Sequence, residues 1–128
     1  MSAEKGMLIV GHGSKSDDAI REFDEVVEMV RQRKSGFYIL GAHMEINHPS
    51  IPDAIDLLMS SGIIDITVVP YFLFKGKHSK FDIPQILKDK KSKHPQLKIR
   101  LTRAVGVEPL MAEILLNRAL DTDLQTIE

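Results

Sequence analysis

The chain has 128 residues, of which 43% are hydrophobic and 27% charged, and its formal net charge is −1. This length and composition are typical of one compact globular domain, so we predict a single domain over residues 1–128. The balanced charge gives no global positive field for a nucleic acid, and no apolar run approaches the ~20 residues of a membrane span. We therefore expect neither nucleic acid nor membrane as a partner.

The chain contains no cysteine. This excludes disulfides, thiolate catalysis and cysteine-ligated metal centres, so a bound metal must be held by His, Asp, Glu or water. The first residues, "MSAEKGMLIVGHGS", lack the apolar region and the small-residue cleavage site of a secretory signal. We expect a cytoplasmic protein.

The first half of the chain alternates short apolar runs with helical periodicity. Residues 7–10 form an apolar run stopped by glycines, which predicts a strand buried on both faces. Ser16 and Asp17 can cap a helix, because apolar residues follow at three- and four-residue intervals as far as Val30. A second apolar run at 37–46 predicts a strand whose firmest part is 37–40, and a second helix starts at 49–52 and ends at Gly62.

The second half of the chain repeats this alternation, with strands predicted at 63–73 and 97–106 and a final helix at 107–120. Between the strands, residues 82–96 hold a short helix with Pro84 near its first turn and Pro95 beyond its end. Pro70 should mark the end of the third strand or an irregularity in it. We expect the tail, 121–128, to fray. The order β-α-β-α-β-α-β-α predicts an α/β fold, a four-stranded parallel sheet flanked by helices, in which ligands bind at the carboxyl ends of the strands.

Residues suited to metal and anion chemistry follow the predicted strands. The first strand is followed by "GHGSK", with glycines on both sides of His12, and the second by His43 and Glu45. Arg103 lies toward the carboxyl end of the fourth predicted strand, and the segment after the third strand carries Lys75, Gly76, Lys77, His78 and Lys80. Three strands thus deliver His12, Glu45 or His43, and His78 to one rim of the sheet.

Each histidine also has an ordinary structural interpretation. His12 and His78 can be solvated loop residues, and His43 can be a satisfied core histidine. His48 before a proline can shape the start of a helix, and His94 lies far from the rim, so both are interpreted as structural. The convergence of His12, Glu45 and His78 favours function, because the fold alone brings them together.

Two imidazoles and one carboxylate suit a borderline divalent ion such as Co²⁺, Ni²⁺, Fe²⁺ or Zn²⁺. Three protein ligands leave coordination positions of the metal open. A site that transfers its metal to another molecule requires such open positions. The lysines in the segment after the third strand are suited to a polyanionic substrate, since their flexible ammonium groups can pair with several carboxylates.

Three stretches resemble the small class II tetrapyrrole chelatases, the family of the archaeal sirohydrochlorin cobaltochelatase. They are "IVGHGS", "MEINHPSIPDAI" and "VVPYFLFKGKHSKFDIP", and the last is similar to the family's Pro-x-Phe-Leu…Gly-x-His…Asp-[Ile/Leu]-Pro signature. The resemblance extends over nearly the whole chain.

The resemblance implies sirohydrochlorin as the substrate and Co²⁺ as the metal inserted, in the anaerobic route to cobalamin. Relatives that insert Ni²⁺ or Fe²⁺ keep those metals open. His12 and His78 match the family histidines that act at the metal, and Glu45 matches an acidic position used in some members. Because longer relatives hold two such domains in one chain, the resemblance implies a homodimer.

On this interpretation His12, His78 and Glu45 are the metal-binding and catalytic residues. The carboxylates of the substrate would be bound by the rim residues Gly13, Ser14, Lys75, Gly76, Lys77 and Lys80. Insertion exchanges two pyrrole protons for one metal ion, so no redox step and no organic cofactor is expected.

Two other classes of function use the same residues. A non-catalytic carrier would bind metal or tetrapyrrole and hand it on. A phosphoryl-transfer or nucleotide-binding enzyme built on "GHGSK" is disfavoured, because neither Gly-x-x-x-x-Gly-Lys-[Ser/Thr] nor Gly-x-Gly-x-x-Gly is present. A histidine phosphatase would place an arginine before the histidine, where Gly11 stands.

Overall fold

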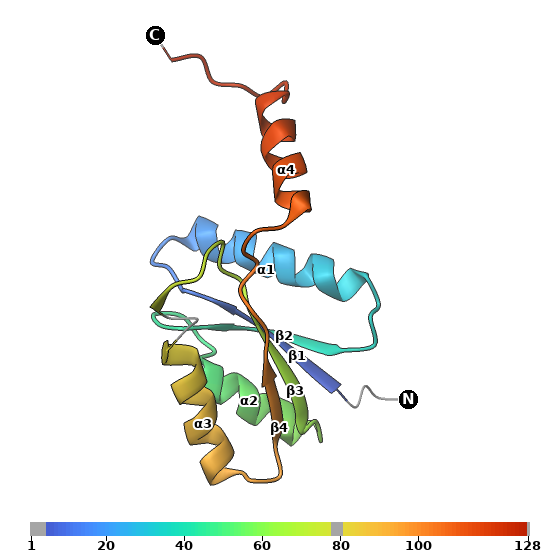
Figure 1. The fold of residues 1–128 in the computed structure, drawn as a ribbon, viewed down its shortest axis with the longest axis vertical. Coiled ribbons are helices and arrows are strands. Elements are labelled where there is room, and N and C mark those ends of the chain that lie inside the picture. The colour runs from blue at the N-terminus through green and yellow to red at the C-terminus, as the bar shows by residue number, and fades with distance from the viewer. Residues whose placement is uncertain (1–4, 78–80, 128) are drawn as a thin grey trace.

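A computed structural model describes residues 5–77 and 81–127 of the chain, and Figure 1 shows its fold. Four strands alternate with four helices in the predicted order, which confirms the α/β fold class. The elements are β1 (Lys5–Gly11), α1 (Asp17–Gln32), β2 (Tyr38–His43), α2 (Ile51–Ser60), β3 (Asp65–Pro70), α3 (Ile83–Lys93), β4 (Lys98–Leu101) and α4 (Pro109–Ala119).

The four strands form one parallel sheet in the order β2-β1-β3-β4. Helix α1 lies on one face of the sheet, and α2 and α3 lie on the other (Figure 1). The larger core lies under α2 and α3, whereas the smaller one, centred on Ile9, Val27 and Ile39, lies under α1. The central strand β1 is therefore covered on both faces, as its unbroken apolar sequence predicts.

Local signals in the sequence explain where the helices begin. The Ser16 side chain accepts a hydrogen bond from the Ala19 N–H at 3.3 Å and caps α1. The Ser50 side chain accepts one from the Asp53 N–H at 3.2 Å and caps α2. Each cap satisfies a backbone donor that the first helical turn leaves without an intrahelical partner.

The third strand ends where its proline predicts, whereas the fourth strand is shorter than the predicted 97–106. Strand β3 ends at Pro70, as the proline predicts, and β4 ends at Leu101. Residues 121–127 form neither helix nor strand. Helix α4 lies where the sequence predicts a helix, but it extends away from the sheet in Figure 1. None of the helices within the described ranges is long and apolar enough to span a membrane.

Candidate functional site

The loops that follow β1 and β2 are joined through their backbones. The Met44 N–H donates to the Gly11 carbonyl at 2.9 Å, and the Glu45 N–H donates to the His12 carbonyl at 3.3 Å. These bonds continue the β1–β2 pairing past the end of β1. They place His12 and Glu45 on adjacent loops, as the sequence predicts.

Gly13 is the residue that permits this approach. Its φ is +92°, in the left-handed region, and a Cβ built on it would lie 2.0 Å from the Glu45 carbonyl oxygen. Any other residue at this position would both strain the backbone and force the two loops apart. Gly13 therefore permits both the turn after His12 and the close packing of this loop against the loop after β2.

The Ser14 N–H, the first donor after Gly13, donates to the Asn47 Oδ1 at 2.7 Å. The Ser14 hydroxyl in turn accepts a hydrogen bond from the Ser16 N–H at 3.0 Å. The predicted role of this segment as an anion site stays a prediction, and a substrate carboxylate would have to replace the Asn47 oxygen to reach the Ser14 N–H.

The third strand contributes aromatic side chains at the same edge of the sheet. The Tyr71 N–H donates to the Val10 carbonyl at 2.7 Å, which holds the start of the β3 loop against the end of β1. The buried Phe72 ring stacks on the His12 ring, with centroids 4.0 Å apart and an interplanar angle of 22°. His12 as a whole residue is exposed, and Phe72 supports one face of its imidazole.

His43 is buried, with 4% of its surface exposed, and its Nδ1 has no hydrogen-bond partner in the described part of the chain. Its ring lies 4.9 Å from the Phe23 ring. Burial lowers the pKa of His43, while Asp24 opposes that shift more weakly. The burial agrees with one of the two interpretations that the sequence left open, that of a core histidine, but the Nδ1 lacks the partner that a satisfied core histidine would have.

A small pocket connects His43 with the exposed part of the site. It has a volume of about 190 Å³, and its lining includes His12, Ser14, His43 and Tyr71. It lies between the loop after β1, the first turns of α1 and the end of β3. Residues that carry polar side chains, from the ends of β1, β2 and β3, thus line one small space beside His12.

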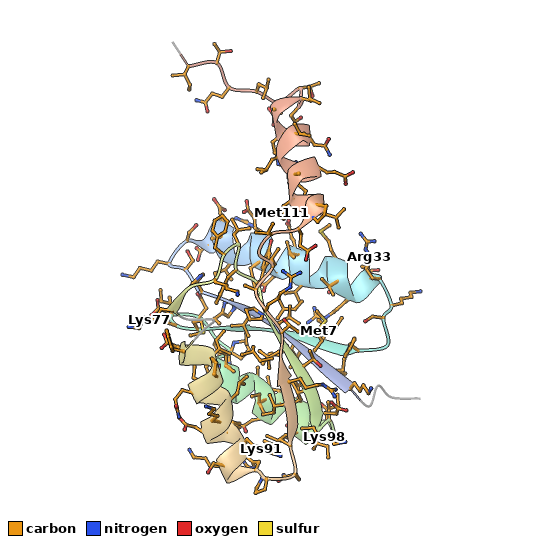
Figure 2. All side chains as sticks on the ribbon, in the orientation of Figure 1. Met7, Arg33, Lys77, Lys91, Lys98 and Met111 are labelled. Carbon is orange, nitrogen blue, oxygen red and sulfur yellow. The ribbon has the colours of Figure 1, made fainter. Side chains whose placement is uncertain are left out.

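The structure describes only part of the predicted ligand set. Glu45 is exposed, as are Lys75 and Lys77 in the loop after β3. Figure 2 shows Lys77 at the edge of the molecule where the strands end. His78 and Lys80 lie outside the described residues.

Within residues 5–77 and 81–127, no three His, Asp or Glu side chains are placed to hold a metal ion together. His12 and Glu45 are the two predicted ligands in these ranges, and the third, His78, lies outside them. The metal-binding roles of all three therefore remain predictions.

The structure adds apolar residues that sequence reasoning left out. Leu73, Phe74 and Phe81 are 52%, 75% and 61% exposed, and they flank the lysine-containing segment. Large apolar side chains exposed beside cationic ones are suited to a ligand with both apolar and anionic parts. Their signal was present in "PYFLFKG", where four of seven residues are large and apolar.

The other candidate residues have structural partners. Arg103 forms an ion pair with Glu108, and His48 lies 3.7 Å from Asp53 at the start of α2. The His94 N–H donates to the Lys90 carbonyl at 3.0 Å at the end of α3. The structural interpretation of these two histidines agrees with these contacts.

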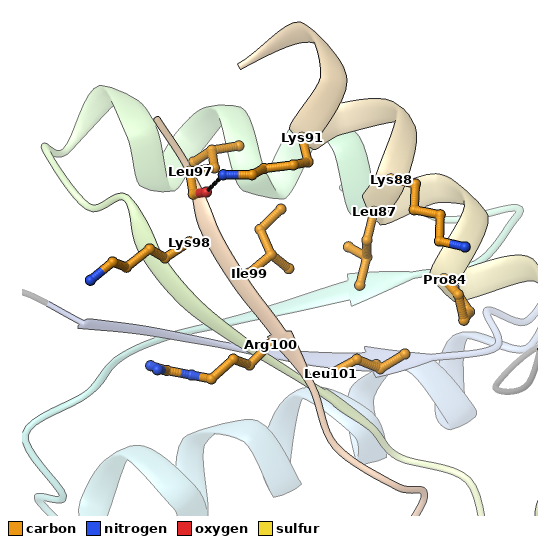
Figure 3. A pocket seen from close by; sticks show the side chains of 9 residues that line it. All are labelled: Pro84, Leu87, Lys88, Lys91, Leu97, Lys98, Ile99, Arg100 and Leu101. Carbon is orange, nitrogen blue, oxygen red and sulfur yellow. Dashed lines mark hydrogen bonds between the residues drawn. The ribbon is translucent and has the colours of Figure 1, made fainter. Parts of the chain in front are cut away.

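A second hollow lies elsewhere on the molecule, between α3 and the edge strand β4 (Figure 3). It has a volume of about 540 Å³ and a floor formed by Leu87, Leu97 and Ile99. Of the lysines on its rim, Lys91 donates to the Leu97 carbonyl. None of its lining residues belongs to the strand-end site.

Comparisons with known proteins agree with this architecture. The CbiX family model matches residues 6–122. The chain is 36% identical to the sirohydrochlorin cobaltochelatase of Sulfurisphaera tokodaii over 115 residues, which cover 88% of this chain and 89% of that protein. It is 33% identical to the chloroplastic sirohydrochlorin ferrochelatase of Arabidopsis thaliana over 114 residues, 88% of this chain and 50% of that protein.

Among solved structures, the sirohydrochlorin chelatase SirB of Bacillus subtilis subspecies spizizenii, in complex with cobalt, matches with a TM-score of 0.88 at 25% identity. The match covers 93% of this chain and 51% of that one. The chain thus spans about half the length of the Arabidopsis and Bacillus proteins. The family model and the S. tokodaii relative both cover most of the sequence, and the chain therefore belongs to the CbiX family.

Proposed function

We propose that this protein is a sirohydrochlorin chelatase that inserts Co²⁺, its substrate metal, into the tetrapyrrole. The observation that carries the proposal is the junction of three strand ends, where His12, Glu45 and the aromatic residues of the β3 loop come together. Its relatives in the CbiX family carry the names of sirohydrochlorin cobaltochelatase and ferrochelatase. Substrate and reaction are transferred to this chain on those two grounds.

The reaction replaces two pyrrole protons with one divalent metal ion. A neutral imidazole can accept a proton or bind a metal through the same nitrogen, but it cannot do both at once. We assign His12 and His78 to share these two tasks, with Glu45 as a further ligand or as an outlet for protons. The stacked Phe72 ring fixes the plane of the His12 imidazole, so less freedom is lost when it meets the substrate.

The segment after β3 is assigned to substrate binding. Its lysines, Lys75, Lys77 and Lys80, would pair with the carboxylates of sirohydrochlorin, while Leu73 and Phe74 would contact the flat face of the macrocycle. Gly13 and Ser14 lie in the loop after β1, and Gly76 lies in the loop after β3. Their small size would let the backbone approach the macrocycle. In this proposal the protein acts as a homodimer without an organic cofactor.

The donor set of the site suits more than one divalent metal. Co²⁺, Ni²⁺ and Fe²⁺ all accept imidazole and carboxylate ligands, and selection also depends on the supply of each metal in the cell. A carrier that binds metal or tetrapyrrole without catalysing insertion would use the same residues, so rates are needed to separate the two.

An anaerobic assay tests the proposal directly. Sirohydrochlorin is incubated with Co²⁺, Ni²⁺ or Fe²⁺, with and without the protein, and insertion is followed by absorbance. We expect the protein to raise the Co²⁺ rate well above the spontaneous rate. Acceleration with Ni²⁺ or Fe²⁺ alone would reassign the metal, and binding without acceleration of any metal would identify a carrier.

A further inference from the structure

Helix α3 and the edge strand β4 enclose the hollow of about 540 Å³ shown in Figure 3, which we call the α3–β4 groove. Its volume falls within the range of roughly 300–1,000 Å³ that small-molecule sites occupy. One wall consists of residues 97–101, and the other consists of Pro84, Leu87, Lys88 and Lys91. Counted from the first of these helical residues, the others follow after three, four and seven positions, so all of them lie on one side of α3.

The floor of the α3–β4 groove is apolar. Leu87 and Leu97 are buried, and Ile99 and Leu101 are half-buried. Figure 3 shows Leu87, Ile99 and Leu101 between the helix and the strand, while the alternate side chains of β4 point away from the helix. This is the alternation expected of a strand, in which every second side chain lies on one face. The groove therefore offers a continuous apolar surface along β4.

Lys91 brings a positive charge to one end of this surface. Its Nζ donates to the Pro95 carbonyl at 2.6 Å and to the Leu97 carbonyl. An ammonium group has three donors, so one N–H of Lys91 remains for a further acceptor. Lys88 lies one turn earlier on the same side of α3 and is exposed. Within the described ranges, neither lysine forms an ion pair with an acidic side chain.

The cations beside two other hollows of the molecule do have acidic partners. Arg31 lines a hollow at the edge strand β2 and pairs with Glu28 at 2.9 Å. Lys90 lines a hollow between α2 and α3 and pairs with Asp56. In contrast, the described residues that line the α3–β4 groove include no Asp or Glu. An apolar floor with positive charge that no acid balances is complementary to a ligand that carries its own negative charge.

We propose that the α3–β4 groove binds a small organic anion with an elongated apolar body, of the class of a medium-chain carboxylate. The carboxylate pairs with Lys91 and Lys88, and the apolar body lies along the floor toward the start of α3. Residues 97–101 span about 13 Å at a rise of about 3.3 Å per residue, which suits an extended chain. None of the lining residues belongs to the strand-end site, so the inference does not rest on the proposed function.

Binding should require both parts of such a ligand. An ion pair with an exposed lysine contributes little by itself, because water screens it and the side chain loses freedom. An apolar chain without a charge would cover the floor but would leave the third donor of Lys91 without an acceptor. The two contributions together favour an amphipathic anion over either a simple anion or a neutral apolar molecule.

Three probes separate these contributions. Decanoate has both the chain and the charge, decanol has the chain alone, and butanoate has the charge with a short chain. Each is titrated into the full ¹⁵N-labelled chain, without metal or tetrapyrrole, and the backbone amide signals are followed by NMR. We expect decanoate to shift the signals of residues 84–91 and 97–101 until they saturate. Decanol and butanoate should bind about tenfold more weakly or not at all.

Substitutions of the two lysines test the contribution of charge. Lys88→Gln combined with Lys91→Gln should weaken decanoate binding by about tenfold or more, because both partners of the carboxylate are lost. The control combines Lys5→Gln with Lys93→Gln, which makes the same change of net charge at two exposed residues outside the groove. We expect the dissociation constant of the control to change by less than about twofold.

Lys88→Gln alone provides a second variant in case the loss of the Lys91 hydrogen bonds disturbs the fold. Lys88 is exposed and has no ion-pair partner in the described part of the chain, so circular dichroism should be unchanged. Decanoate binding should still weaken measurably in this variant. Equal binding by the unsubstituted protein, this variant and the double variant would overturn the inference.

The loop after β3 also combines exposed apolar residues with lysines, and it is the alternative site for the probe. If decanoate shifts the signals of residues 71–77 and not those of 97–101, the inference is wrong. Loss of binding in a chain with Lys75→Gln and Lys77→Gln would have the same meaning. Because these titrations use neither metal nor sirohydrochlorin, their outcome and that of the insertion assay are independent of each other.

Discussion

At the scale of single residues, the site depends on positions where the backbone has no room for a side chain. Gly13 has a positive φ and lies against the Glu45 carbonyl, whereas Gly36 has a similar φ of +90° and a Cβ added there would meet nothing within 4 Å. Comparing substitutions at the two glycines therefore distinguishes the cost of backbone strain, which both share, from the cost of a steric clash, which only Gly13 would have. Sequence alone cannot make this distinction, because the Glu45 carbonyl comes from another loop.

We predict that Gly13→Ala destabilises the protein more than Gly36→Ala does. Both substitutions strain a left-handed backbone, at a cost of about 1 kcal/mol, and the clash at Gly13 should add on the order of 2 kcal/mol. Urea unfolding followed by circular dichroism measures the difference. Equal losses of unfolding free energy in the two variants would show that the loops tolerate the methyl group.

His43 predicts a pH dependence of folding. Burial lowers its pKa in the folded protein, so the unfolded chain binds a proton more readily, near the ordinary value of 6.5. The free energy of unfolding should therefore be greatest above pH 6.5 and should fall as the pH drops from there through the lowered pKa of the folded state.

The measurement is urea unfolding between pH 7.5 and about 5, a window that covers the lower side of the ordinary histidine pKa. The His43→Phe variant should lose less unfolding free energy across this window than the unsubstituted protein. His94→Gln serves as the control, because the contact at 3.0 Å that His94 makes at the end of α3 is through its backbone. An unchanged slope in His43→Phe would contradict the assignment.

At the scale of elements, each strand end delivers one part of the proposed chemistry. The loop after β1 carries His12, the loop after β2 carries Glu45, and the loop after β3 carries the lysines and exposed apolar residues. The periodicity of the sequence predicted these elements because apolar spacing is local information. It also predicted the end of β3, since Pro70 cannot donate to a continuing ladder.

What the sequence could not predict at this scale depends on contacts between distant segments. The stacking of Phe72 on His12 joins residues 60 positions apart in the chain, as their numbers show. The Phe23 ring of α1 lies 4.9 Å from the His43 ring, and the His43 Nδ1 finds no hydrogen-bond partner among the described residues. The sequence of α4 predicted a helix, but not that the helix leaves its own domain.

The loop after β3 can be tested through its charge. Replacing Lys75, Lys77 and Lys80 together by Gln should weaken sirohydrochlorin binding, most strongly at low salt, because screening already weakens the attraction at high salt. Binding is measured by fluorescence or absorbance titration across ionic strengths. A control with the same change of charge replaces the exposed Lys88, Lys93 and Lys98.

The expected result is a reduced salt dependence of binding in the first variant and an unchanged dependence in the control. If both variants respond equally, the attraction comes from the overall charge of the protein. The loop would then have no specific part in holding the carboxylates.

At the scale of the whole molecule, the parallel sheet brings the loops after β1, β2 and β3, which are far apart in the sequence, to one edge of the sheet. Hydrogen bonds of the Met44 and Tyr71 N–H groups tie the second and third loops to the end of β1.

The most direct measurement is the rate of metal insertion by His12→Ala and His78→Ala, at saturating sirohydrochlorin and under anaerobic conditions, beside His94→Ala as the matched histidine control. We predict a loss of about a hundredfold or more for each of the first two variants, with circular dichroism unchanged, because each removes a group that meets the metal or the pyrrole protons. His94→Ala should insert metal at nearly the unsubstituted rate. Rates for His12→Ala and His78→Ala that equal the rate of His94→Ala would contradict the proposed site.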